Sequence, residues 1–268
     1  MLEDAIAGTD LYYAALYFPK NIRPILSALE IIRREVTSIP FEISDPSVSN
    51  LKLSWWWDEV ARLKAKASRH PATALLAEHD PSPGAVSKKL HDLIENAQTL
   101  VHQAPAIGVD ALLENIRIIN EPVFHHLLKT CDKEVGDNSE LVLRFAYTSE
   151  LVNHLLSPRF KSHASLTKPR STSAVLDSAS QLNIPTNAES QSNDLRKNLM
   201  ISVLEELAST LSACPNTLHR KQRFFSTLAR INQSVLKRTI ANKAPRSNRV
   251  ELLPITKLWI SWRTNFLF

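Results

Sequence analysis

The residues with the most specific pattern are three consecutive tryptophans, Trp55-Trp56-Trp57, followed directly by Asp58-Glu59. A dozen residues later the chain reads Arg69-His70-Pro71. Indole rings in such a cluster can line a cavity for an apolar ligand, and a core or partner-facing stripe is an equally good interpretation. The residue before a proline is often a helix boundary. We therefore interpret His70 as a packing residue at a helix end rather than as a catalytic base.

Other groups that could do chemistry are poorly spaced for it. His125 and His126 are adjacent, so on a helix they point about 100° apart and cannot easily share one metal ion. Cys131 follows His125 by six residues, a spacing that does not form a nucleophile–base pair within one helix. Motif spacing therefore gives no metal centre, and we expect no cofactor.

Composition limits the class of protein. The chain has 268 residues, 44% of them hydrophobic, and only four are glycines, which leaves little material for glycine-rich phosphate loops. No apolar run approaches the roughly 20 residues of a membrane span, and the N-terminus lacks the plan of a signal peptide. We expect a cytoplasmic protein, peripheral to a membrane at most, or a mitochondrial matrix protein if the host is a eukaryote.

The net charge of +5 is unevenly spread, because no acidic residue occurs between Leu207 and Val250. This basic segment could face an anionic membrane surface or an acidic protein partner, and a solvated helix face is the simpler interpretation. We do not expect nucleic acid as the partner. The residues that would form the surface are Arg220, Lys221, Arg223, Lys237 and Arg238.

Apolar residues recur at helical spacing along most of the chain, and no strand-like alternation of useful length occurs. The pattern predicts an all-α protein with a single domain over residues 1–268. A polar loop should span about 162–194, carrying at most a short helix near 175–182. Helices are predicted after Pro24 and ending before Pro40, at about 48–66, after Pro83-Gly84 to about 101, at 112–131 with either a kink or the start of a fresh helix at Pro122, at 141–156, 199–211 and 224–240.

Two amphipathic segments each have an apolar face that could be buried in the core or exposed. In the helix predicted at 48–66, we expect Leu51, Trp55, Val60 and Leu63 to point inward. The tail from Leu252 to Phe268 is rich in Leu, Trp and Phe. It could lie at a membrane interface, and packing into the bundle is the simpler interpretation.

Several blocks of sequence, in a fixed order, carry a resemblance to a known family. They are Asp10 to Pro19, Arg23 to Leu29, Leu51 to Trp56 with Asp58-Glu59, His70-Pro71-Ala72, and near the end Leu258-Trp259 and Trp262-Arg263. Together they resemble the squalene/phytoene synthase family, strongly for residues 10–76 and more weakly beyond. That family joins two prenyl diphosphates head to head. The resemblance implies a class I isoprenoid synthase helical bundle with a central cavity for prenyl chains.

The family's chemistry depends on two acidic motifs, each with a pair of aspartates four residues apart. Such a pair lies on one helix face, where its oxygens can hold Mg²⁺ for the diphosphates. The resemblance places Thr37 and Phe41 at the first pair of positions. The nearest acids, Glu35 and Glu42, are seven residues apart, which is too far for both to grip one ion in the usual way.

The second motif should follow Asn153-His-Leu-Leu, which places Ser157 and Lys161 at the aspartate positions. Arg159 and Lys161 would repel a magnesium ion, although they could bind a diphosphate directly. From the resemblance, the candidates for substrate binding are Glu35, Trp55, Trp56, Arg159 and Lys161. Catalytic residues cannot be assigned from these degenerate positions.

Two functions follow. The first is a family member that has lost Mg²⁺-dependent condensation and acts as a binding or assembly factor. This is what a resemblance to the mitochondrial complex I assembly branch implies, because that branch keeps the fold without intact aspartate motifs. The second is an active squalene- or phytoene-type prenyltransferase, with Mg²⁺ as cofactor. In either case a prenyl or other lipid could occupy the central cavity.

Overall fold

The computed structural model describes residues 7–103, 109–131, 139–156, 187–212, 223–241 and 251–266, which are helical and include no β-strand. Prolines begin α4, α5, α6 and α11, where the missing N–H group has no helical partner to lose. The helices are α2 (Asp10–Ala15), α3 (Arg23–Glu42), α4 (Pro46–Ala61) with a 3₁₀ turn η1 (Arg62–Ala65), α5 (Pro71–His79), α6 (Pro83–His102), α7 (Val109–Cys131), α8 (Ser139–Leu156), α9 (Asn187–Ser212), α10 (Arg223–Ala241) and α11 (Pro254–Phe266).

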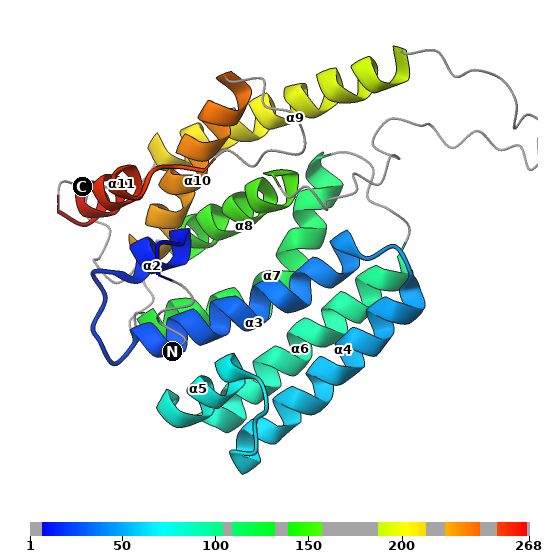
Figure 1. Cartoon of the computed structure of the whole chain (residues 1–268), viewed down its shortest axis with the longest axis vertical. Coiled ribbons are helices and arrows are strands. Elements are labelled where there is room, and N and C mark those ends of the chain that lie inside the picture. Colours follow the sequence, from blue (N-terminus) through cyan, green and yellow to red (C-terminus); the bar gives the residue numbers. More distant parts are fainter. Residues whose placement is uncertain are drawn as a thin grey trace, which may run out of the picture.

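The helices pack in two groups that share a core (Figure 1). In the first group α3 packs against α4, α5, α6 and α7. In the second group α10 packs against α8, α9, α2 and α11. Helix α7 joins the groups, because it packs against α3 and α6 as well as α8. The all-α prediction is confirmed. None of the described helices combines the length and hydropathy needed to cross a membrane.

Three predicted boundaries differ from the structure. Helix α3 continues past Pro40 to Glu42, because a proline in the last turn removes little of the helical hydrogen bonding. Helix α7 begins at Val109, three residues before the predicted start, and continues to Cys131 with Pro122 inside it, so no fresh helix begins at the proline. Helix α9 already begins at Asn187, so the predicted loop to residue 194 is wrong over its last eight residues. This stretch is polar but contains good helix formers, which hydrophobic periodicity does not detect. The predicted helix at 175–182 lies outside the described residues.

The predicted inward face of α4 is partly wrong. Leu51 is 73% exposed and Trp55 is 44% exposed. Helix α4 instead turns its neighbouring stripe toward α3 and α6, and the following 3₁₀ turn continues that stripe. The buried side chains are Leu53, Trp56, Val60 and Leu63.

Candidate functional site

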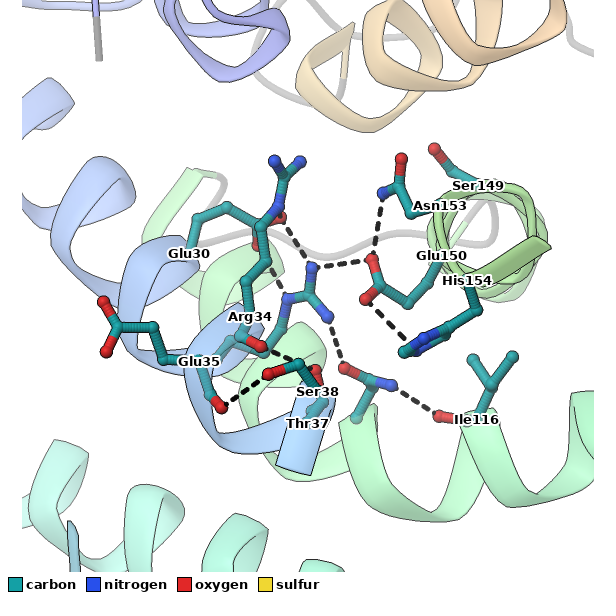
Figure 2. Close-up of polar contacts among 12 residues, drawn as sticks. Glu30, Arg34, Glu35, Thr37, Ser38, Ile116, Ser149, Glu150, Asn153 and His154 are labelled. Carbon is teal, nitrogen blue, oxygen red and sulfur yellow. Dashed lines mark hydrogen bonds and ion pairs between the residues drawn. The ribbon is translucent and has the colours of Figure 1, made fainter. Parts of the chain in front are cut away.

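The inner face of α3 carries a buried ion cluster. Arg33 is 1% exposed, and its Nε and Nη2 donate to the two carboxylate oxygens of Glu30, both at 2.7 Å. The same Nη2 also donates to Glu150 Oε2 on α8 at 2.8 Å. Nη1 donates to Asn120 Oδ1 on α7 at 2.6 Å. The guanidinium therefore ties α3, α7 and α8 together in the interior, between helices that Figure 2 shows facing one another.

Electrostatics keep this cluster charged. Burial alone would raise the pKa of Glu150, but the Arg33 guanidinium outweighs burial and holds that pKa well below its usual range. The pKa of Glu30 is lowered in the same way, by Arg33 and by Arg34, whose Nε donates to Glu30 at 2.8 Å. Asn153 Nδ2 adds a hydrogen bond to Glu150 at 3.1 Å (Figure 2). The carboxylates thus already have cationic partners.

The first pair of motif positions lies on the same face of α3, one and two turns further on. Thr37 is fully buried, and its hydroxyl donates to the carbonyl of Arg34 at 3.5 Å. Phe41 is buried, and its ring lies 4.3 Å from the imidazole of His154, centroid to centroid. His154 lies in the last turn of α8 and is buried too. Aromatic side chains therefore fill the space between α3 and α8 at this level.

The other face of α3 forms an open groove with α4, of about 450 Å³. It brings together three of the predicted binding residues, Glu35 from α3 and Trp55 and Trp56 from α4. The remaining lining residues are Ser38, Ile39, Glu42, Ile43 and Lys52. The predicted candidates Arg159 and Lys161, like Ser157, lie outside the described residues.

His70 is the N-cap of α5, and its ring lies beside three residues of the groove, Glu35, Trp55 and Trp56. Its Nδ1 accepts a hydrogen bond from the Ala72 N–H at 3.2 Å, which leaves Nε2 to carry the ring proton in the neutral form. Nε2 lies 3.6 Å from Glu35 Oε1. The ring packs against those of Trp55 and Trp56, at centroid distances of 6.3 Å and 5.0 Å. The histidine thus lies at a helix end, as predicted.

Glu59 holds the chain before α5 against α4. This fully buried carboxylate accepts hydrogen bonds from the backbone N–H groups of Arg69 and His70, at 2.7 Å and 2.8 Å. It also accepts one from the Thr73 hydroxyl at 2.5 Å and one from Arg62 Nη1 at 3.1 Å. Burial would raise the pKa of Glu59, but these donors together lower it. In the sequence Glu59 stands out only as part of the family resemblance, and its role in holding the chain before α5 depends on contacts that span up to 14 residues.

Comparison with known proteins places these helices in a family. The sequence profile of the family described as squalene/phytoene synthase matches residues 6–155, more than half of the chain. The chain belongs to the squalene/phytoene synthase family. No curated protein and no solved structure matched it. The matched region runs from just before α2 almost to the end of α8 and includes the buried ion cluster and the groove.

The described residues of this squalene/phytoene synthase family member do not fit the magnesium ions that the family's chemistry implies. Thr37 and Phe41 offer no carboxylate, and Glu30 and Glu150 are already bound to Arg33. Within the described part of the chain, no three His, Cys, Asp or Glu side chains are grouped to hold a metal. The donor set is that of a saturated ion pair rather than of a Mg²⁺ site.

The predicted basic surface is only partly described, since Arg220 and Lys221 lie outside the described residues. Arg223 is half-buried and donates to the carbonyl of Asn265 near the C-terminal end of α11. Lys237 and Arg238 are exposed in the last turns of α10, about 20 Å from Arg223 along the helix. Arg223 therefore binds the C-terminal end of α11. A basic surface that includes all five predicted residues stays a prediction.

Proposed function

We propose that this chain is a non-catalytic member of the squalene/phytoene synthase family that acts as a binding or assembly factor. The observation that carries the proposal is the pair of side chains at the first motif. Thr37 and Phe41 stand where the resemblance places two aspartates, and Phe41 packs against His154 across the space between α3 and α8. The resemblance to the mitochondrial complex I assembly branch supports the same function.

The chemistry of the reaction explains why these two positions matter. Ionising an allylic diphosphate requires positive charge at the leaving group, because negative charge develops there as the C–O bond breaks. In this chain two buried carboxylates of the interior, Glu30 and Glu150, neutralise Arg33 instead of holding a metal ion. Their low pKa values come from that partner. In the described residues the polar interior therefore ties α3, α7 and α8 together, and the first motif supplies no carboxylate to hold the metal that ionisation needs.

The surface retains features suited to binding. Val48, Leu51 and Trp55 form an exposed apolar stripe on α4 beside the groove, and they are 42%, 73% and 44% exposed. Isolated apolar side chains on a surface are common, but a contiguous stripe beside a groove is typical of an interaction site. We place partner binding on this stripe and groove. Occupation of the bundle by a prenyl or other lipid stays a prediction.

Direct assay tests the loss of chemistry. The purified chain is incubated with farnesyl or geranylgeranyl diphosphate and Mg²⁺, beside an active family synthase as positive control. We expect no squalene or phytoene. We also expect a thiodiphosphate analogue with Mg²⁺ to leave the melting temperature almost unchanged, since little binding gives little stabilisation. Product above the no-enzyme blank, or a shift of several degrees, would support an active head-to-head prenyltransferase.

The assembly role is tested in a host that contains complex I. Deleting the gene should lower assembled complex I on native gels. Wild type and the control Trp57→Ala should restore it, and Leu51→Ser with Trp55→Ala should not. Trp57 is a suitable control because it is also half-exposed on α4 but packs against His91 rather than lining the groove. Unchanged complex I after deletion would remove the assembly part of the proposal.

A further inference from the structure

Helix α11 packs against the bundle through its polar side. Lys257 Nζ lies 2.8 Å from Asp10 Oδ1, and the Ser261 hydroxyl donates to the Tyr13 carbonyl at 2.5 Å. Thr264 and Asn265 share this inward face, and all four polar side chains of α11 named here are buried. These contacts to α2 fix the rotation of α11 about its own axis.

The opposite side of α11 and the residue before the helix are apolar and exposed. Most of these positions recur at helical spacing, so they form one stripe about 20 Å long. Trp259 and Trp262 stack within it, with ring centroids 5.2 Å apart. The exposed fractions are 62% for Leu253, 72% for Ile255, 40% for Leu258, 54% for Trp259, 38% for Trp262 and 53% for Phe266.

This orientation inverts the usual arrangement of a surface helix. A helix of a globular protein normally buries its apolar stripe and exposes its polar one. Here the polar side makes specific inward contacts, so rotation of α11 to bury the tryptophans would break the Lys257–Asp10 and Ser261–Tyr13 contacts. A contiguous exposed apolar face of this kind is typical of a site that binds a membrane or another protein.

The charges of the neighbouring residues indicate what kind of surface covers the apolar face of α11. Helix α10 packs against α11, and the printed sequences of both helices contain no Asp or Glu. The basic residues within their bounds are Arg223, Arg230, Lys237, Arg238, Lys257 and Arg263, of which Lys257 is bound to Asp10 on the inward side and Arg223 to the Asn265 carbonyl. An aromatic apolar stripe beside purely basic helices matches an anionic bilayer surface, where tryptophan rings sit at headgroup level and basic residues are attracted to the lipid charge.

We propose that the outer face of α11 docks on an anionic lipid bilayer, with Trp259 and Trp262 inserted at the level of the headgroups. The helix lies in the plane of the interface, because its polar side remains bound to α2. This inference does not depend on whether the chain is catalytic. It goes beyond the proposed binding role, which uses the groove of α3 and α4 in another part of the bundle (Figure 1).

Vesicle flotation tests the proposal with the full chain. Wild type is mixed with vesicles of phosphatidylcholine, with or without phosphatidylglycerol, at low and high salt. We expect flotation with the anionic vesicles that weakens as salt rises. Trp259→Ala with Trp262→Ala should reduce the bound fraction by about tenfold or more. Lys237→Glu with Arg238→Glu should reduce it severalfold and flatten the salt dependence.

Matched controls show whether a loss of flotation is specific to the outer face of α11 or follows from removing any exposed apolar or basic side chains. Trp57→Ala with Ile118→Ala removes two apolar side chains, 41% and 38% exposed, that lie on α4 and α7, and Lys64→Glu with Lys88→Glu reverses two exposed charges far from α11. Both controls should float like wild type. Absence of wild-type flotation, or equal flotation of the Trp259/Trp262 variant, would overturn the proposal. So would a dimer, seen by sedimentation, that the same variant dissociates without any vesicle binding.

Discussion

The Arg33 side chain determines both the charge balance of the interior and the contacts between three helices. Its guanidinium compensates carboxylates from α3 and α8, and it also lies 4.7 Å from the centroid of the Phe124 ring. A buried ion pair contributes little net stability compared with a hydrophobic replacement, but removing one partner leaves an uncompensated charge. The cluster therefore fixes the relative positions of α3, α7 and α8 more than it adds to the total stability.

We predict that Arg33→Met lowers the free energy of unfolding by about 3–5 kcal/mol, because Glu150 and part of the Glu30 charge lose their cation. Arg117→Met is the matched control. Arg117 is bound to Glu114 and Glu121 on the surface of α7, so its loss should cost at most about 1 kcal/mol. Urea denaturation measures both values. Equal losses for the two variants would show that the interior charges are not compensated as described.

The sequence could not predict this cluster. Periodicity assigns charged residues to solvent, and Arg33 and Glu150 are 117 residues apart in the chain. The motif positions were easier to locate, because Thr37 and Phe41 follow directly from the register of the family resemblance. What they do instead of binding metal required the structure, since the contact of Phe41 with His154 depends on the packing of α3 and α8.

At the scale of elements, amphipathic periodicity predicted that helices exist better than it predicted which face is buried. Helix α4 carries two apolar stripes, and the one with Leu51 and Trp55 is exposed. Helix α11 buries polar side chains and exposes its tryptophans. In both helices the neighbouring elements decide the face, and a single-helix pattern does not contain that information.

We predict that Trp56→Ala costs about 3–5 kcal/mol of unfolding free energy, as expected for a large cavity in a core. Trp56 is 4% exposed, and its ring contacts those of Trp55 and His70. Trp57→Ala should cost much less, because the Trp57 side chain is 41% exposed. Thermal and urea unfolding of the two variants give the comparison. A larger loss for Trp57 would mean that α4 is rotated relative to the face described.

For the whole molecule, buried ionisable groups make stability depend on pH in two separate ranges. The pKa values of Glu30, Glu59 and Glu150 are lowered in the fold, so their contribution is present above the usual carboxyl range and is lost as the pH falls below about 4.5. His154 makes the stability depend on pH in a higher range, near the ordinary pKa of an imidazole. Burial lowers its pKa from the ordinary value of 6.5, despite the nearby carboxylates of Glu150 and Glu42.

The sign for His154 follows from proton binding. As the pH falls below 6.5 the unfolded chain takes up a proton at this imidazole more readily than the folded chain does, so stability decreases with falling pH. One such group changes the unfolding free energy by at most about 1.4 kcal/mol per pH unit, or about 2 kcal/mol between pH 6.5 and 5. The carboxylates contribute little in that window, because it lies above their usual range.

We therefore predict that His154→Gln flattens the decrease in stability between pH 6.5 and 5, whatever its effect at pH 7. His125→Gln is the control, because that histidine is exposed on α7, beside Glu121 at 3.8 Å. It should keep the pH dependence of wild type. Urea denaturation at half-unit pH steps measures the slopes. An unchanged slope in His154→Gln would mean that the imidazole facing Phe41 is accessible to protons in the fold, and that α3 and α8 are less closely packed at the first motif than their contacts indicate.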